Sequence, residues 1–226
     1  DSQAGTGAVI LDTPFVVQSG DVVDMGESSV RSIGIPDSLP FDAFEDGNYV
    51  HALGQWWWSY TDKAQGGNST ISNPFQLDSV PPGPGAGNSL GCAGVSFSFG
   101  NARAVPFVGV GTYFARGTSG AAVAVDLSAL KSIRVSTRGS GAVMGVYLLS
   151  AYQPVGGTPV GVLDSLSTEW RASLLSLSDT LAHDSFGLTL ADHLRFATGL
   201  ILTLTPRSGA TEGELWIDDV VLDFRK

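Results

Sequence analysis

Short runs of apolar and β-branched residues alternate with polar ones along the chain, and glycine, proline or asparagine interrupts most of them before they reach the length of an ordinary helix. Alternation of this kind places successive side chains on opposite faces of a strand. The pattern predicts strands at 56–60, 69–72, 94–99, 107–113, 121–125, 132–137, 143–150, 200–205 and 213–217. Many short strands separated by turn residues predict an all-β chain, folded as a sandwich or a barrel.

The remaining segments carry weaker signals. Residues 188–196 predict one short helical turn, and residues 126–131 predict a capped turn that leads into a strand. The run of proline and glycine at 80–88 predicts a surface loop, because proline removes backbone donors and glycine is costly to order. The pattern of apolar and polar residues in the first 40 positions differs from that in the rest of the chain. We therefore expect residues 1–40 to be an extension, either a linker or an added strand pair that can pack on the sandwich, and residues 41–226 to form the β-sandwich domain.

The central aromatic run holds Trp56, Trp57, Trp58 and Tyr60 within five residues. In a strand, Trp56, Trp58 and Tyr60 share one face and Trp57 takes the other. One core face cannot bury all four rings, so an aromatic surface should lie near solvent. Because Trp57 shares its face with the polar residues Gln55, Ser59 and Thr61, the pattern favours Trp57 as the exposed ring.

Composition narrows the range of partners. The 22 acidic and 12 basic residues give a net charge of −10, which repels phosphate backbones and anionic lipid surfaces. We therefore expect no nucleic-acid partner, and no apolar run is long enough to insert across a bilayer. The single cysteine, Cys92, excludes an internal disulfide. A hydrophobic content of 43% supports a sizeable core.

Several motifs occur in a fixed order. They are FDAFEDGN at 41–48, GQWWWSYTD at 54–62, GGNST at 66–70, DLS at 126–128, IRVSTRG at 133–139 and ELWIDDV at 214–220. Together they resemble galactose-binding-like jelly-roll domains, many of which are carbohydrate-binding modules of fibre-degrading bacteria. The resemblance covers roughly residues 41–224, and it is strongest to the family eleven and family thirty β-glucan-binding modules. It implies that the domain at 41–226 is a carbohydrate-binding, two-sheet antiparallel β-sandwich, with a glycan groove on the concave sheet and often a structural calcium that joins the two ends of the chain.

A sugar ring offers apolar C–H patches on its faces and hydroxyl groups around its edge, so an aromatic platform with polar groups at its rim suits it. The carbohydrate-binding residues that we predict are Trp56, Trp57, Trp58, Tyr60, Asp62, Arg134, Arg138 and Tyr147, with Gln55 as an alternative to Asp62 at the rim. Two alternatives stay open. The rings can be sandwich core, and the alternation around Arg134 and Arg138 can mark only the solvent side of a sheet. Tyr113 and Trp170 are further ring candidates, and for these two and Tyr147 a core position is the more common outcome.

A second group of candidates consists of carboxylates near the two ends of the domain. Asp42 and Glu45, with Asp46, precede the first core strand, and Asp218 and Asp219 lie in the last. Calcium takes several oxygen ligands, so two distant segments can build one site. We predict Asp42, Glu45, Asp218 and Asp219 as ligands of a structural Ca²⁺. The alternative is a solvated acidic turn at each end.

Catalytic signatures are incomplete. Ser128 and Lys131 match the Ser-x-x-Lys pattern without its partner motifs, and the three histidines lack metalloprotease spacing. We therefore expect no enzyme but a secreted or cell-surface module, monomeric, that binds a plant-type polysaccharide such as cellulose or another β-glucan and targets an attached enzyme or cell to it. One alternative is a glycoside hydrolase or lyase that uses two carboxylates. Another is a structural or adhesion domain of the cell envelope.

Overall fold

The computed structural model describes residues 37–72, 85–87, 89–152, 157–177 and 187–224, and two short strands at 8–9 and 32–33. These two strands, β1 (Ala8–Val9) and β2 (Ser32–Ile33), pair with each other. Most of the predicted extension at 1–40 and of the loop at 80–88 lies outside the described residues. None of the helices in the described part is long and apolar enough to cross a membrane.

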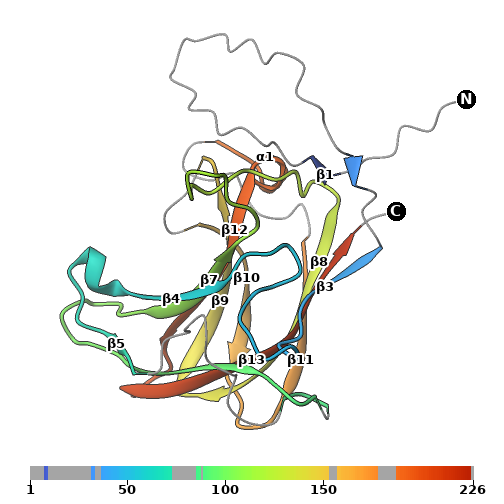
Figure 1. Ribbon diagram of the computed structural model, residues 1–226. Coiled ribbons are helices and arrows are strands. Elements are labelled where there is room, and N and C mark those ends of the chain that lie inside the picture. The colour runs from blue at the N-terminus through green and yellow to red at the C-terminus, as the bar shows by residue number, and fades with distance from the viewer. Residues whose placement is uncertain are drawn as a thin grey trace, which may run out of the picture.

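The other strands form two antiparallel sheets that pack face to face (Figure 1). The five-stranded sheet has the order β10-β9-β12-β7-β4, with β4 (Trp57–Thr61), β7 (Val108–Tyr113), β9 (Ala142–Ser150), β10 (Thr158–Ser165) and β12 (Ala197–Pro206). The six-stranded sheet has the order β11-β8-β13-β6-β5, and β3 also pairs with β13. Its strands are β3 (Ser38–Asp42), β5 (Thr70–Ile71), β6 (Ala93–Ser98), β8 (Leu130–Ser140), β11 (Arg171–Ser176) and β13 (Glu212–Phe224). The chain passes repeatedly between the sheets, so the predicted two-sheet jelly roll is confirmed.

The hydrophobic core fills the space between the sheets. It is built from alternate residues of the long strands: Val108 and Val110, Met144, Val146 and Leu148, and Leu200, Leu202 and Leu204 from one sheet, and Ile133, Val135, Leu215 and Ile217 from the other. Burial of each such side chain contributes about 1.5–3 kcal/mol to the hydrophobic stabilisation of the fold. Because these core residues alternate with others along each strand, the second face of each sheet is not part of this core.

Most predicted strands are present, and the errors have physical reasons. The prediction of a strand at 121–125 is wrong, because this segment makes only the isolated bridges of Ala122 with Arg116 and of Val125 with Ala197. Strands β3, β10 and β11 were not predicted. Prolines interrupt the pattern of β3 and β10, at Pro40 and Pro159, and β11 is a largely polar edge strand. Residues 38–40 of β3 pair with β13, although the sequence analysis placed them in the extension.

Both predicted turns are confirmed. Helix α1 (Leu190–Arg195) lies inside the predicted segment and begins with a capping box. Thr189 Oγ1 accepts a hydrogen bond from the Asp192 amide at 3.2 Å, and Asp192 Oδ2 accepts one from the Thr189 amide at 2.8 Å. In the second turn, Asp126 Oδ1 accepts a hydrogen bond from the Ser128 amide at 2.9 Å, just before β8 begins.

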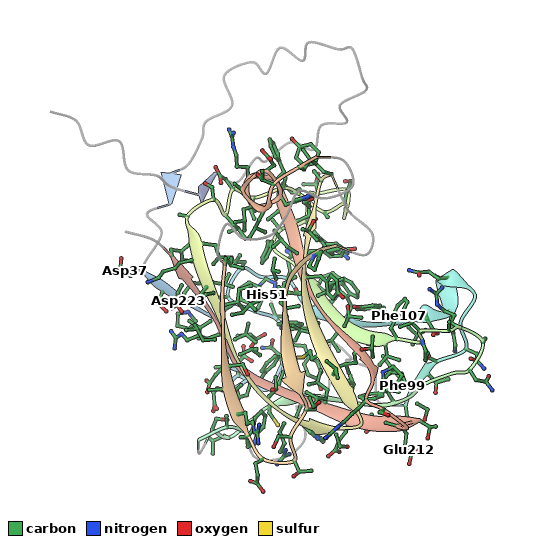
Figure 2. The ribbon with its side chains drawn as sticks, turned by 180° about the vertical axis from the view of Figure 1, so that it is seen from behind. Asp37, His51, Phe99, Phe107, Glu212 and Asp223 are labelled. Carbon is green, nitrogen blue, oxygen red and sulfur yellow. The ribbon has the colours of Figure 1, made fainter. Side chains whose placement is uncertain are left out.

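His51 is buried near the centre of the sandwich (Figure 2). Its ring stacks on Phe41 with centroids 4.1 Å apart. The Leu53 amide donates to Nδ1 at 3.1 Å, so Nε2 carries the proton and donates to the Tyr113 carbonyl at 2.9 Å. Burial lowers the pKa of His51 to about 4. The imidazole is therefore neutral in the folded protein at pH 7.

This lowered pKa predicts a loss of stability in acid. Between pH 6.5 and 4 the unfolded chain binds a proton at His51 that the folded chain does not, so the free energy of unfolding falls as the pH falls through this range. The loss should be on the order of 3 kcal/mol. Urea unfolding at pH 7 and pH 4 measures it.

The matched control for this prediction is His51→Gln, which cannot titrate and can still donate to Tyr113. Asp42, whose pKa is raised, acts in the opposite direction, but it is present in both proteins and cancels in the comparison. The wild-type protein should lose more stability on acidification than the variant. Equal losses would show that His51 is not the group that titrates.

Candidate functional site

The three consecutive tryptophans point to different places. Trp57 is 2% exposed and belongs to the core, where its Nε1 donates to Asp42 Oδ2 at 2.8 Å. Trp56, by contrast, is 39% exposed. The prediction that Trp57 is the exposed ring is therefore wrong. Trp57 pairs across the sheet with Thr112, which is itself buried. The buried partners Thr112 and Asp42 place this face of β4 against the core, although Ser59 on the same face is polar.

The outer face of the five-stranded sheet carries a row of aromatic rings. Trp58 lies 5.5 Å from both Tyr60 and Tyr113 between ring centroids, and Tyr60 lies 6.2 Å from Phe107. All four side chains are half-buried, and with Trp56 they form what we call the aromatic strip. At least one indole of the central run is thus open to solvent, as the platform hypothesis requires.

Two glycines of β7 give the strip its floor. A Cβ atom on Gly109 would collide with the ring of Tyr60, and one on Gly111 would lie 3.0 Å from the indole of Trp58. The rings therefore rest against bare backbone, which lets them lie close to the sheet. Both glycines alternate with the core residues Val108 and Val110, so the same strand closes the core on one face and supports the strip on the other.

Polar groups continue the strip across β12 to β9. The hydroxyl of Tyr60 and Oγ1 of Thr203 are hydrogen-bonded at 2.5 Å. Burial raises the pKa of Tyr60 far above its ordinary value, and Tyr147 adds to this effect. The ring of Tyr147 lies over Gly145, which pairs with Thr203. The structure thus places Tyr147 beside the strip and Tyr113 within it, although a core position is the more common outcome for both rings.

Two arginines that the sequence analysis missed flank the strip. The guanidinium of Arg116 lies 4.7 Å from the ring centroid of Tyr113 and 4.9 Å from that of Trp56. Arg103 lies 5.6 Å from the ring of Phe107 and donates to the Gln65 carbonyl at 2.7 Å. In Figure 2, Phe107 marks this end of the sheet, beside the 3-10 helix η1 (Asp62–Gln65). In the sequence, the one available signal is that each arginine lies three or four positions from an aromatic residue, Arg103 from Phe107 and Arg116 from Tyr113.

Asp62 is not at the rim of the strip. Its side chain is fully buried and accepts hydrogen bonds from the Ser69 amide at 2.9 Å, the Ser69 hydroxyl at 2.8 Å and the Phe107 amide at 3.3 Å. Asp62 therefore fixes the turn after β4 instead of facing a ligand, which corrects its predicted role. Gln55, the alternative, is half-buried next to Trp56.

Arg134 and Arg138 lie on the wrong sheet for the predicted site. Both are on β8 of the six-stranded sheet, whereas the strip is on the five-stranded one. Arg134 forms an ion pair with Asp223 at 2.8 Å across neighbouring strands. Arg138 lies 5.1 Å from the ring centroid of Trp170 and 5.5 Å from that of Trp216. The predicted set of binding residues is thus divided between two faces.

The predicted carboxylates do meet, because β3 pairs with β13 and sets Asp42 opposite Val220. Burial raises the pKa of Asp42 to about 6, with smaller contributions from Asp46 and Asp218. The pKa of Asp219 is also raised, by burial and then by Asp218 and Glu45. Carboxylates of the first segment and of the last strand are therefore close enough to raise one another's pKa values.

Protein donors already hold three of these carboxylates. Asp42 Oδ1 accepts from the Phe44 amide at 2.9 Å, and Asp218 Oδ2 accepts from the Ser89 hydroxyl at 2.6 Å. Glu45 Oε1 accepts from the Leu90 amide at 3.0 Å. In the described parts of the chain, no three side chains of His, Cys, Asp or Glu form a group that could hold a metal. Backbone carbonyls or water would have to complete a calcium shell here.

No protein-family description matches the sequence, and no curated protein matches it. Solved structures do resemble the fold. A family 11 carbohydrate-binding module of the cellulase Lic26A-Cel5E of Clostridium thermocellum is 15% identical, with a TM-score of 0.47 over 74% of this chain and 87% of its own. The module CBM27-1 of Caldicellulosiruptor saccharolyticus is 11% identical, with a TM-score of 0.48 over 84% and 98%. An adhesin domain of Lys-gingipain from Porphyromonas gingivalis is 15% identical, with a TM-score of 0.43 over 84% and 98%. Two of these three similar structures are thus carbohydrate-binding modules and one is an adhesin domain.

Proposed function

We propose that this chain is a non-catalytic module that binds a neutral plant-type polysaccharide, of which β-glucan is the first candidate. The observation that supports this proposal is the aromatic strip: half-buried rings lie on a glycine floor across the outer face of one sheet. Such rings present flat apolar surface to solvent, and pyranose rings present C–H patches of matching shape. The preference for β-glucan rests on the sequence motifs at 41–224.

The surroundings of the strip suit the edges of a sugar. Arg116, held over Tyr113 and Trp56, can donate to hydroxyl groups of a bound chain. Tyr60 and Thr203 add hydroxyls. A bound glycan would therefore meet apolar surface and hydrogen-bonding groups side by side.

The four strands β9, β12, β7 and β4 offer no carboxylate for hydrolysis on this face. Glycosidases use two carboxylates placed on either side of the scissile bond. The outward-facing residues of β4, β7, β9 and β12 include no Asp or Glu, because these strands alternate aromatic, glycine, threonine and aliphatic residues there. Asp62, the nearest acidic residue after β4, is buried and hydrogen-bonded. We therefore propose binding without cleavage.

The role that follows is targeting outside the cell. An open platform buries modest area, so we expect micromolar to millimolar affinity, about −8 to −4 kcal/mol. Weak binding of this kind still holds an attached enzyme or cell near its substrate by raising the effective concentration. Incubation with a polysaccharide panel, followed by affinity electrophoresis and a reducing-sugar assay, should show retardation by β-glucan without release of sugar. Release of sugar, or no retardation by any neutral polysaccharide, would contradict the proposal.

We also propose that a calcium ion binds between the two ends of the domain, near Asp42, Glu45, Asp218 and Asp219. The support is that, in addition to burial, Asp218 helps to raise the pKa of Asp42, and Asp218 and Glu45 help to raise that of Asp219, a repulsion that a divalent cation would relieve. Saturating calcium should raise the melting temperature by about 5–10 °C, and EDTA should reverse the change. A melting temperature that is the same in calcium and in EDTA would show that the protein donors alone hold these side chains.

A further inference from the structure

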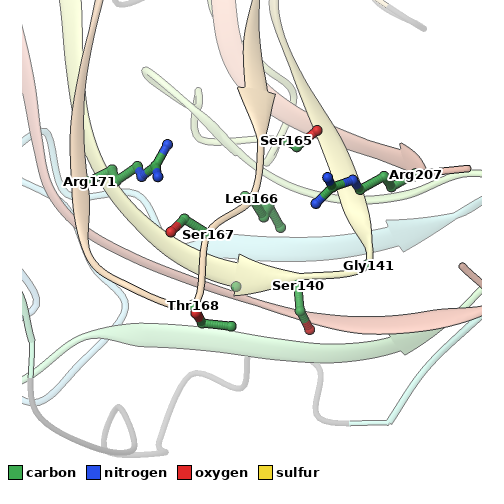
Figure 3. Close-up of a pocket in the computed structure, with 9 residues that line it drawn as sticks. Ser140, Gly141, Ser165, Leu166, Ser167, Thr168, Arg171 and Arg207 are labelled. Carbon is green, nitrogen blue, oxygen red and sulfur yellow. The ribbon is translucent and has the colours of Figure 1, made fainter.

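A pocket of ≈ 500 Å³ opens at one end of the sandwich (Figure 3), and none of the residues that line it belongs to the aromatic strip. Its walls come from the β8–β9 turn, the connection from β10 to β11, and the residue that follows β12. The polar side chains that line it are Ser140, Ser165, Ser167, Thr168, Arg171 and Arg207. Neither the sequence motifs nor the proposed glycan platform accounts for this pocket.

Backbone contacts fix the shape of the pocket. The Gly139 amide donates to the Ser167 carbonyl at 2.7 Å, and the Arg207 amide donates to the Gly141 carbonyl at 3.1 Å. Gly141 has a φ of +77°, and a Cβ there would collide with the Glu212 backbone, so the turn needs glycine. The buried Leu166 lies between the walls. The two arginines are thus carried by segments that are tied together.

The charge of the pocket is unusual for this chain. Figure 3 shows the guanidinium groups of Arg171 and Arg207 extending inward from opposite sides. Among the described residues, neither group has an ion-pair or hydrogen-bond partner, whereas Arg134 is paired with Asp223. No carboxylate lines the pocket. In a protein with a net charge of −10, two unpaired cations on one pocket favour an anionic ligand.

The neighbouring groups favour a sugar as the carrier of that negative charge. Four hydroxyl side chains line the pocket together with the arginines, and hydroxyls can donate to and accept from those of a sugar. Hydroxyl groups beside two cations therefore provide partners for both the hydroxyl groups and the anionic group of an acidic sugar.

We propose that this pocket is a second glycan site that binds an anionic sugar residue, one that carries a carboxylate or a sulfate group. Arg171 and Arg207 hold the anionic group, and the serine and threonine hydroxyls contact the ring hydroxyls. The site is separate from the aromatic strip, so it does not depend on the ligand proposed for the strip. The chain would then recognise neutral and acidic segments of plant or algal polysaccharide at different places.

Affinity electrophoresis at physiological ionic strength tests this proposal with polygalacturonate as the carboxylated polymer, carrageenan as the sulfated polymer and mixed-linked β-glucan as the neutral one. The wild-type protein should be retarded by at least one acidic polymer, and which one identifies the anionic group. The double variant Arg171→Ala/Arg207→Ala should bind that polymer about tenfold more weakly or worse, because it loses both charge-assisted contacts. Both side chains are exposed, so the fold should persist, and a melting curve verifies it.

Two controls separate this site from the strip and from general charge effects. Arg134→Ala removes one positive charge from the same sheet, and it should bind the acidic polymer as the wild type does. The double variant should keep its retardation by β-glucan, and Trp58→Ala should keep its retardation by the acidic polymer. The absence of retardation by both acidic polymers overturns the proposal. So does a loss of binding in Arg134→Ala as large as in the double variant.

Discussion

Replacement of Trp58 by alanine is expected to weaken binding to mixed-linked β-glucan about thirtyfold. Trp58 is at the centre of the aromatic strip, in contact with both Tyr60 and Tyr113, so its loss removes an indole from the middle of the proposed platform. Loss of some 80 Å² of apolar contact corresponds to about 2 kcal/mol of binding free energy. Affinity electrophoresis or isothermal titration calorimetry with purified β-glucan measures the change.

The opposite sheet provides a matched control for this variant. Trp216 is also half-buried on an outer face, where it lies beside Arg138, and Trp216→Ala makes the same chemical change far from the strip. This variant should bind β-glucan as the wild type does. Trp56→Ala offers a second strip variant with little risk to the fold, since Trp56 is 39% exposed. Unchanged binding in both strip variants, with their folds intact, would contradict the proposal that the aromatic strip binds β-glucan.

Replacement of Trp57 by alanine should instead destabilise the protein by about 3–5 kcal/mol. Trp57 is among the largest fully enclosed side chains, and it packs against Phe41 and Phe44 at centroid distances of 6.3 and 6.1 Å. The truncation leaves a cavity and also removes the Nε1 donor from Asp42, whose carboxylate is buried. The free energy of unfolding in urea, for both proteins at pH 7, gives the difference.

Trp57→Phe separates the two contributions. Phenylalanine keeps most of the packing but has no N–H, so the loss should be about 1–3 kcal/mol, from the unpaired Asp42 and the smaller ring. If Trp57→Ala lost less than about 1 kcal/mol, then Trp57 could not be a core residue. Glycan binding by Trp57→Phe should match that of the wild type, because this ring does not face the strip.

Alternation along the chain predicted the two sheets well, but it did not show which face of β4 points inward. Local pattern divides Trp56 and Trp58 from Trp57 correctly, because that division follows from strand geometry alone. The inward face is chosen by partners distant in sequence, namely Thr112 on β7 and Asp42 on β3. The count of polar neighbours on a short edge strand carries little information, since Ser59 and Thr61 are only half-buried.

Which residues lie beside the aromatic strip depends on tertiary structure even more than the inward face of β4 does. Arg138 and Tyr147 are nine positions apart on consecutive strands, yet β8 and β9 belong to different sheets. No spacing rule shows that a strand changes sheet at the glycine turn between them. Arg116, in contrast, folds back over Tyr113 from beyond the end of β7. The meeting of Asp42 with the last strand was predictable only through the resemblance in sequence motifs.

Strand β7 presents no side chain at Gly109 and Gly111 on its outer surface, so the rings there are supplied entirely by adjacent strands. The residues of the aromatic strip and the residues that fill the core are therefore encoded at separate positions. A library that varies Trp58, Tyr60, Tyr147 and Thr203 should change the preferred saccharide while most members still melt close to the parent. The sandwich would then serve as an adaptable scaffold for engineered lectins.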